Sequence, residues 1–138
     1  EIFFDLRQQV TLYPHVKDFL AAASARLPLG ILTNGNADVK KIGIDKFFKC
    51  HFTSLDVKSN KPSSKHFKKA VEFFDVLPEE ILHVGDDKIA DISGCIRAGL
   101  NPLWFNNKSN EWDLDLEEPP QISSWENALE YIEQNYEF

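Results

Sequence analysis

The sequence predicts an α/β fold in which a parallel sheet is covered by helices on both faces. Short apolar runs alternate along the chain with longer segments whose apolar residues recur at helical spacing. The short runs are continuously apolar, which is typical of strands that are buried on both faces. This alternation predicts helical crossovers between parallel strands.

The first half of the chain predicts two helices and two strands. A helix is expected over residues 14–27, where Pro14 is placed to begin it and apolar side chains recur at Val16, Phe19, Leu20, Ala23 and Leu27. The apolar run at residues 29–34 predicts a strand that enters a loop at Gly35. A short helix is expected over residues 37–43, and a second strand over residues 50–54.

The second half continues the alternation. Residues 62–75 predict a helix that presents Phe67, Ala70, Val71 and Phe74 on one face. Strands are expected over 81–85 and 102–106, separated by a helix over 88–99 with Ile89, Ile92 and Ile96 directed inward. Ser123 and Glu126 predict a capping box for a last helix, which buries Trp125, Ala128, Leu129 and Ile132.

Bulk composition excludes several classes of function. The chain has 138 residues, enough for one domain, and its formal net charge of −7 argues against binding nucleic acid. No apolar run approaches the ~18–20 residues of a membrane helix, and no secretory signal is recognised. Cys50 and Cys95 lack a C-x-x-C neighbour and are expected to be reduced thiols of a cytoplasmic protein. Because the chain contains no Met, it is expected to be processed or a piece of a longer chain.

Three groups of polar residues lie at the ends of predicted strands or in the loops after them. These groups are Thr33-Asn34-Gly35, Asn60-Lys61-Pro62, and Gly85-Asp86-Asp87 with Asp91 close behind. In parallel sheets, functional residues collect at the carboxyl ends of the strands. A hydroxyl, loop amides and an ammonium suit the oxygens of a phosphoryl group, while carboxylates suit Mg²⁺. The sequence therefore predicts a site for a phosphoryl group beside a magnesium ion.

Each group also has a simpler interpretation. The Thr-Asn-Gly triplet alone indicates a turn, and Lys61 alone indicates a surface lysine. Asp86 or Asp87 could be the N-cap of the next helix, and Asp91 could complement the helix dipole. The four histidines form no metal-ligand spacing and are predicted to be structural, with His83 in a buried strand. The order of the three groups at successive strand ends favours a shared site.

The stretches GILTNGN, NKP and LHVGDDKIADISGCIRAG resemble motifs II, III and IV of the haloacid dehalogenase (HAD) superfamily. The particular resemblance is to its subfamily I, the phosphatase-like hydrolases that include flavin mononucleotide and sugar-phosphate phosphatases. It extends over about residues 8–106, and VTLYPHVKDFL resembles the segment that leads from the helical cap back to the core. The resemblance implies a Rossmann-like core sheet and hydrolysis of phosphate monoesters through an aspartyl-phosphate.

The resemblance also implies roles for individual residues. Thr33 and Lys61 would be the catalytic residues of this part of the chain, and both would bind the phosphoryl group together with the backbone amides of Asn34 and Gly35. The substrate would be a small phosphorylated metabolite.

The acidic cluster would belong to the metal. The resemblance implies that Asp86 ligates Mg²⁺ and that Asp87 and Asp91 lie near the metal shell, with Asp91 acting through water or by orienting its neighbours. The cation would offset the repulsion between these carboxylates.

The N-terminal D-x-D motif of the superfamily, which supplies the nucleophile and the general acid, is not recognised here. Asp5 is followed two positions later by Arg7, so residues 1–10 are predicted to be the end of a cap helix and residues 11–138 the core domain. The expected sheet is therefore incomplete, lacking its central strand and most of the cap. We expect residues 1–5 or a neighbouring molecule to fill this gap, or the two flanking strands to move together and close it. Unpaired strand edges would also favour self-association.

Four functions remain open at this point. The first is a Mg²⁺-dependent phosphatase whose nucleophile lies elsewhere, so that this chain alone is inactive. The second is a non-catalytic protein that binds a phosphoryl ligand or a partner. A receiver domain is disfavoured because its acids precede the Thr and Lys along the chain, and a metal-free dehalogenase is disfavoured by the Gly-Asp-Asp cluster.

Overall fold

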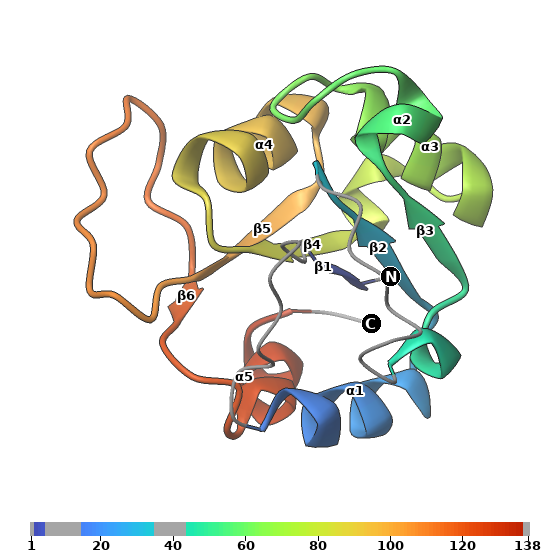
Figure 1. Cartoon of the computed structure of the whole chain (residues 1–138). Helices are drawn as coiled ribbons and strands as arrows, with labels where there is room; N and C mark the ends of the chain where they lie inside the picture. Colours follow the sequence, from blue (N-terminus) through green and yellow to red (C-terminus); the bar gives the residue numbers. More distant parts are fainter. Residues whose placement is uncertain (1, 5–14, 35–43, 137–138) are drawn as a thin grey trace.

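The computed structural model describes residues 2–4, 15–34 and 44–136. Within them, six parallel strands form one sheet in the order β3-β2-β1-β4-β5-β6 (Figure 1). The strands are β1 (Ile2–Phe4), β2 (Leu29–Leu32), β3 (Cys50–Phe52), β4 (Leu82–Gly85), β5 (Asn101–Phe105) and β6 (Gln121–Ile122). The predicted parallel sheet is confirmed.

Helices cover both faces of this sheet (Figure 1). One face carries α1 (Val16–Ser24) and α5 (Ala128–Asn135), which contact each other. The other carries α3 (Lys65–Phe74) and α4 (Gly94–Ala98), the latter preceded by the π-helix η3 (Lys88–Ser93). Shorter elements are α2 (Ser54–Val57) and the 3₁₀ turns η1 (Asp45–Phe47) and η2 (Pro78–Glu80). None of the described helices is long and apolar enough to cross a bilayer.

Each face of the sheet has its own hydrophobic core. Under α1 and α5, Trp125 stacks on Phe105 with ring centroids 4.9 Å apart and meets Phe19 edge-on at 5.1 Å. Under α3 and α4, Phe67 packs with Leu32 and other buried residues. Burial on both sides explains why β2 is apolar along its length and why β4 is apolar apart from His83.

The centre of the sheet is occupied by β1. Phe3 is in parallel register with Gly30 of β2 and with His83 of β4. The expectation that the N-terminal segment fills the gap is confirmed for Ile2–Phe4, and the cap helix predicted over 1–10 is wrong for these residues. Residues 1 and 5–10 lie outside the described residues, and a domain boundary at residue 10 stays a prediction. Because β2 and β4 are both paired, the expected reason for self-association is removed, and self-association itself stays untested.

Several predicted elements are shifted. The helix predicted from residue 62 begins at Lys65, since Ser63 N–H donates to Asn60 O in a turn. Ile89 is 54% exposed instead of inward. The Ser123/Glu126 capping box does not occur, because the last helix begins only at Ala128. The helix predicted over 37–43 lies outside the described residues, and α2 and β6 were not predicted.

Candidate functional site

The predicted site residues gather at the carboxyl-terminal edge of the sheet. Thr33 follows β2 directly and is fully buried, and Asp86 follows β4 and is half-buried. Lys61 reaches this edge from the loop before α3, and its Nζ donates to Leu32 O at 3.2 Å. The ammonium of Lys61 thus lies at the end of β2. Gly35 lies outside the described residues.

The side chain of Asn34 connects the loop after β2 to the loop that contains Lys61 through two hydrogen bonds. Its Oδ1 accepts from Lys61 N–H at 2.7 Å, and its Nδ2 donates to Lys61 O at 3.2 Å. Ser54 Oγ lies 2.7 Å from Asn34 O and 2.6 Å from Asn60 Oδ1. The Asn34 side chain therefore positions Lys61, a role that the sequence did not indicate, and Ser54 supports both loops.

Lys61 and Asp91 form a buried ion pair. Their side chains have no exposed surface, and Nζ lies 2.5 Å from Oδ1. His83 Nε2 lies 3.1 Å from the same oxygen, while Asp87 N–H donates to Oδ2 at 3.1 Å. Since a carboxylate only accepts, His83 donates from Nε2. Burial lowers the pKa of His83, which favours the neutral form of the ring. Asp91 therefore orients Lys61, which is one of the two roles expected for it.

Gly85 makes the approach of Asp91 to β4 possible. A Cβ on Gly85 would lie 2.3 Å from Cγ of Asp91 and 2.5 Å from its Cβ. Asp91 cannot move away, because both its carboxylate oxygens are hydrogen-bonded. The glycine of the Gly-Asp-Asp triplet is thus required by close packing.

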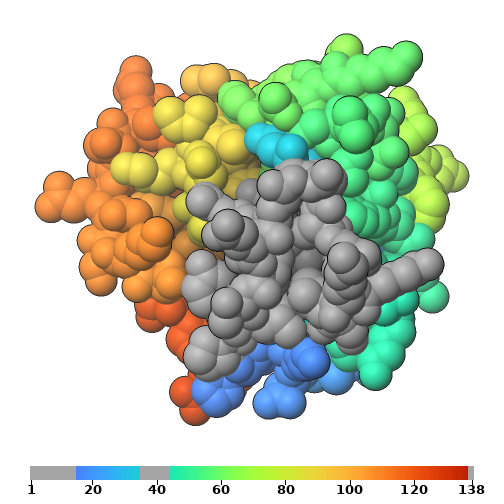
Figure 2. Space-filling view, in the orientation of Figure 1, coloured from blue at the N-terminus to red at the C-terminus, as the bar shows by residue number. Residues whose placement is uncertain are grey.

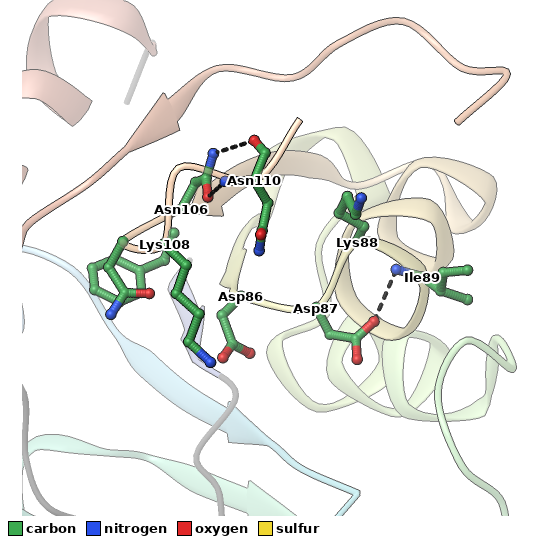
Figure 3. A pocket seen from close by; sticks show the side chains of 9 residues that line it. Asp86, Asp87, Lys88, Ile89, Asn106, Lys108 and Asn110 are labelled. Carbon is green, nitrogen blue, oxygen red and sulfur yellow. Dashed lines mark hydrogen bonds between the residues drawn. The ribbon is translucent and has the colours of Figure 1, made fainter. Parts of the chain in front are cut away.

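Asp86 and Asp87 have different surroundings. Asp87 Oδ1 accepts from the N–H groups of Ile89 and Ala90, both at 2.9 Å, so this residue caps η3 as one interpretation of the sequence expected. Asp86 is fixed through its backbone, since its carbonyl accepts from Trp104 Nε1 at 3.1 Å. The Asp86 and Asp87 side chains line a pocket of about 250 Å³, and Asp91 is not among its lining residues (Figure 3).

The donor set at this pocket fits Mg²⁺ only as a partial shell. Among the described residues, no three His, Cys, Asp or Glu side chains are arranged to hold a metal. Mg²⁺ is usually bound in phosphate sites by one or two carboxylates together with waters and phosphate oxygens. Asp86 and the second oxygen of Asp87 meet that requirement, whereas Asp91 is occupied by Lys61 and His83.

The backbone of Thr33 is fixed on both sides. Its N–H donates to Phe52 O at 3.0 Å, and its carbonyl lies 2.9 Å from His66 Nε2, which donates to it. His66 is fully buried, and burial lowers its pKa. The sequence did not associate His66 with the site, because an isolated histidine on a helix carries no spacing signal.

Comparison with known proteins gives a consistent result. The profile of the haloacid dehalogenase-like hydrolases matches residues 1–105. A phosphoserine phosphatase of Thermus thermophilus is 36% identical over 77% of this chain and 45% of its own length. The Escherichia coli 5-amino-6-(5-phospho-D-ribitylamino)uracil phosphatase YigB is 30% identical over 83% of this chain and 50% of its own length.

Comparison with solved structures gives the same family. The 2-haloacid dehalogenase from Pseudomonas syringae superposes with a TM-score of 0.86 at 30% identity, over 92% of this chain and 55% of that one. The chain thus spans about half the length of each of these three relatives.

Proposed function

Because this chain belongs to the family of haloacid dehalogenase-like hydrolases, we propose that it forms the phosphoryl-binding and metal-binding part of a phosphatase in its phosphatase-like branch. The parent enzyme would be cytoplasmic and would hydrolyse phosphate monoesters of small metabolites through an aspartyl-phosphate, with no nucleic-acid or membrane partner. The buried Lys61, held between Leu32 O and Asp91, carries the proposal. An ammonium buried at a strand end is costly, and stabilisation of a phosphoryl group accounts for its presence there.

Each residue of the site has a distinct role in this proposal. The Thr33 hydroxyl and the amides of Asn34 and Gly35 bind the phosphoryl oxygens, and Lys61 offsets their charge. Asp86 holds Mg²⁺, which when bound neutralises charge that develops on the phosphoryl group. Asp87 contributes its second oxygen, and Asp91 keeps Lys61 in place.

We expect the 138-residue chain alone to have no phosphatase activity, because no N-terminal D-x-D motif is recognised in it. Asp5 follows β1 in the sequence and lies outside the described residues. The missing motif also supports a second candidate, a non-catalytic protein that binds a phosphoryl ligand or a partner. The retained Lys61 and Asp86 favour the phosphatase.

Calorimetric titration of the chain with MgCl₂ and then with inorganic phosphate tests the proposed site. We expect Mg²⁺ to bind and to promote phosphate binding, and Asp86→Asn to abolish both effects. Asp115→Asn, which removes an exposed carboxylate of the loop after β5, is the matched control and should bind as the wild type does. Unchanged Mg²⁺ binding in the Asp86→Asn variant would contradict the assignment.

The expected inactivity is tested separately with p-nitrophenyl phosphate. Appreciable Mg²⁺-dependent turnover by the wild-type chain, lost in Asp86→Asn, would show that the nucleophile is present in these 138 residues.

A further inference from the structure

The pocket beside Asp86 has a second wall that the proposed phosphoryl site does not use. This wall consists of Phe105 at the end of β5 and the segment 106–110 after it, and it faces the start of η3 (Figure 3). In the space-filling view, the orange segment after β5 lies next to the yellow one that contains η3 and α4 (Figure 2). The pocket therefore lies between two neighbouring segments at the same edge of the sheet.

Asn106 fixes the conformation of this wall. It is 8% exposed, and its Nδ2 donates to Asn110 O and to Gln121 Oε1, both at 2.9 Å. In return, Asn110 N–H donates to Asn106 Oδ1 at 2.9 Å. These bonds close residues 106–110 into a turn and anchor it to β6, so Lys108 is presented from a defined backbone.

Two lysines line the pocket, and their surroundings differ. Lys88 Nζ lies 2.7 Å from Asp113 Oδ1 and donates to Glu111 O at 3.0 Å. The bond to Lys88 lowers the pKa of Asp113. Lys108 has no hydrogen bond or ion pair with any residue in the part of the chain that the structure describes. Figure 3 shows its side chain directed toward the carboxylate of Asp86.

We propose that Lys108 binds a second anionic group of the substrate, a carboxylate or a phosphate carried by the leaving group. This inference rests on the proposed function, because the first phosphoryl group is bound at Thr33 and Lys61. It restricts the substrate to phosphate monoesters with a further negative charge a few bonds from the ester oxygen. Lys108 is then a residue that determines specificity.

The charges around the pocket support this assignment. In the free protein, Asp86 and Asp87 repel an anion. A divalent cation at Asp86 reverses the sign of the local charge, and Lys108 then adds an ammonium that forms no ion pair with any described residue. The side chain of Asn110 also lines the pocket and offers an amide donor. An anion is therefore bound there only together with the cation.

A pair of matched probes tests the inference. In excess MgCl₂, calorimetry compares 3-phosphoglycerate with glycerol 3-phosphate, which carries a hydroxymethyl group in place of the carboxylate. We expect the wild-type chain to prefer 3-phosphoglycerate, and Lys108→Ala to reduce this preference by about two- to fivefold, the range of exposed charge pairs. Lys88→Ala also removes one positive charge from the pocket, but it should retain the preference.

The outcomes separate this inference from the proposed function. If both probes bind equally well to the wild type, or if Lys108→Ala keeps the preference, Lys108 does not read a second anion, and the phosphoryl site stands. If neither probe binds, or if binding is the same without Mg²⁺ and in Asp86→Asn, the proposed function fails and the inference fails with it.

Discussion

Lys61 shows how a single charged residue is kept inside this fold. Its ammonium is removed from water, which costs several kcal/mol for an isolated ion. The carboxylate of Asp91 and the carbonyl of Leu32 offset that cost at 2.5 Å and 3.2 Å. The pair is therefore stable as a unit, and either partner alone is a buried charge.

A double-mutant cycle tests this dependence. We expect Lys61→Met and Asp91→Asn each to lower the free energy of unfolding by about 3–5 kcal/mol, because each disrupts the buried ion pair. The double variant should lose less than the sum, by roughly 0.5–3 kcal/mol. Urea denaturation followed by circular dichroism measures all four proteins. Additive losses would show that the two side chains are not coupled.

At this scale the sequence predicted position better than role. The order along the chain predicted that Thr33 and Asp86 follow strands and that Lys61 lies in a loop before a helix, and the structure brings the three to one edge of the sheet. The sequence did not predict that the Asn34 side chain forms hydrogen bonds with the backbone of Lys61, or that His83 donates to Asp91. Such contacts depend on side-chain direction in three dimensions, which spacing along the chain does not determine.

The element η3 shows why helical periodicity failed locally. Inward positions for Ile89, Ile92 and Ile96 were inferred from 3.6 residues per turn. The segment is π-helical, and Ile92 N–H donates to Asp87 O, five residues earlier, at 3.2 Å. The wider turn changes the phase, so Ile89 faces solvent while Ile92 is buried. The elements α2 and β6 are too short to give a periodic signal.

The short helix α2 depends on its capping box. Thr53 Oγ1 accepts from Asp56 N–H at 3.2 Å, and Asp56 Oδ2 accepts from Thr53 N–H at 2.8 Å. The bond from Thr53 N–H is the main reason why the pKa of Asp56 lies below its ordinary value. Capping therefore makes α2 sensitive to acid.

We expect Thr53→Ala to destabilise the protein by about 1 kcal/mol at neutral pH. The contribution of ionised Asp56 is complete above the ordinary carboxyl pKa and is lost as the pH falls through the lowered pKa, because the unfolded state binds the proton first. Urea midpoints measured from neutral pH down through the lowered pKa of Asp56 test this. The midpoint of the wild type should approach that of Asp56→Asn as the pH falls. A difference that is independent of pH would contradict the capping role; Asp115→Asn is the control.

At the scale of the whole molecule, β1 joins two halves of the sheet. On one side lie β2 and β3, and on the other lie β4, β5 and β6. The sequence indicated that a central strand was needed, but three residues give too short a pattern to identify it. Local preference cannot decide this case, because pairing with β2 and β4 is non-local and is decided by the rest of the fold.

A proline in β1 tests whether this strand connects the halves. Each N–H of a central strand faces one neighbour or the other, so Phe3→Pro removes a bond between strands and introduces a ring that a central strand does not accommodate. We expect the free energy of unfolding to fall by roughly 1–3 kcal/mol. We also expect concentration-dependent association in sedimentation velocity, because the edges of β2 and β4 become available. Phe3→Leu keeps the backbone donor and should remain monomeric wherever the wild type is. If Phe3→Pro were as stable as Phe3→Leu and associated no more, the halves would be connected by contacts other than β1, such as those between the helices that cover each face.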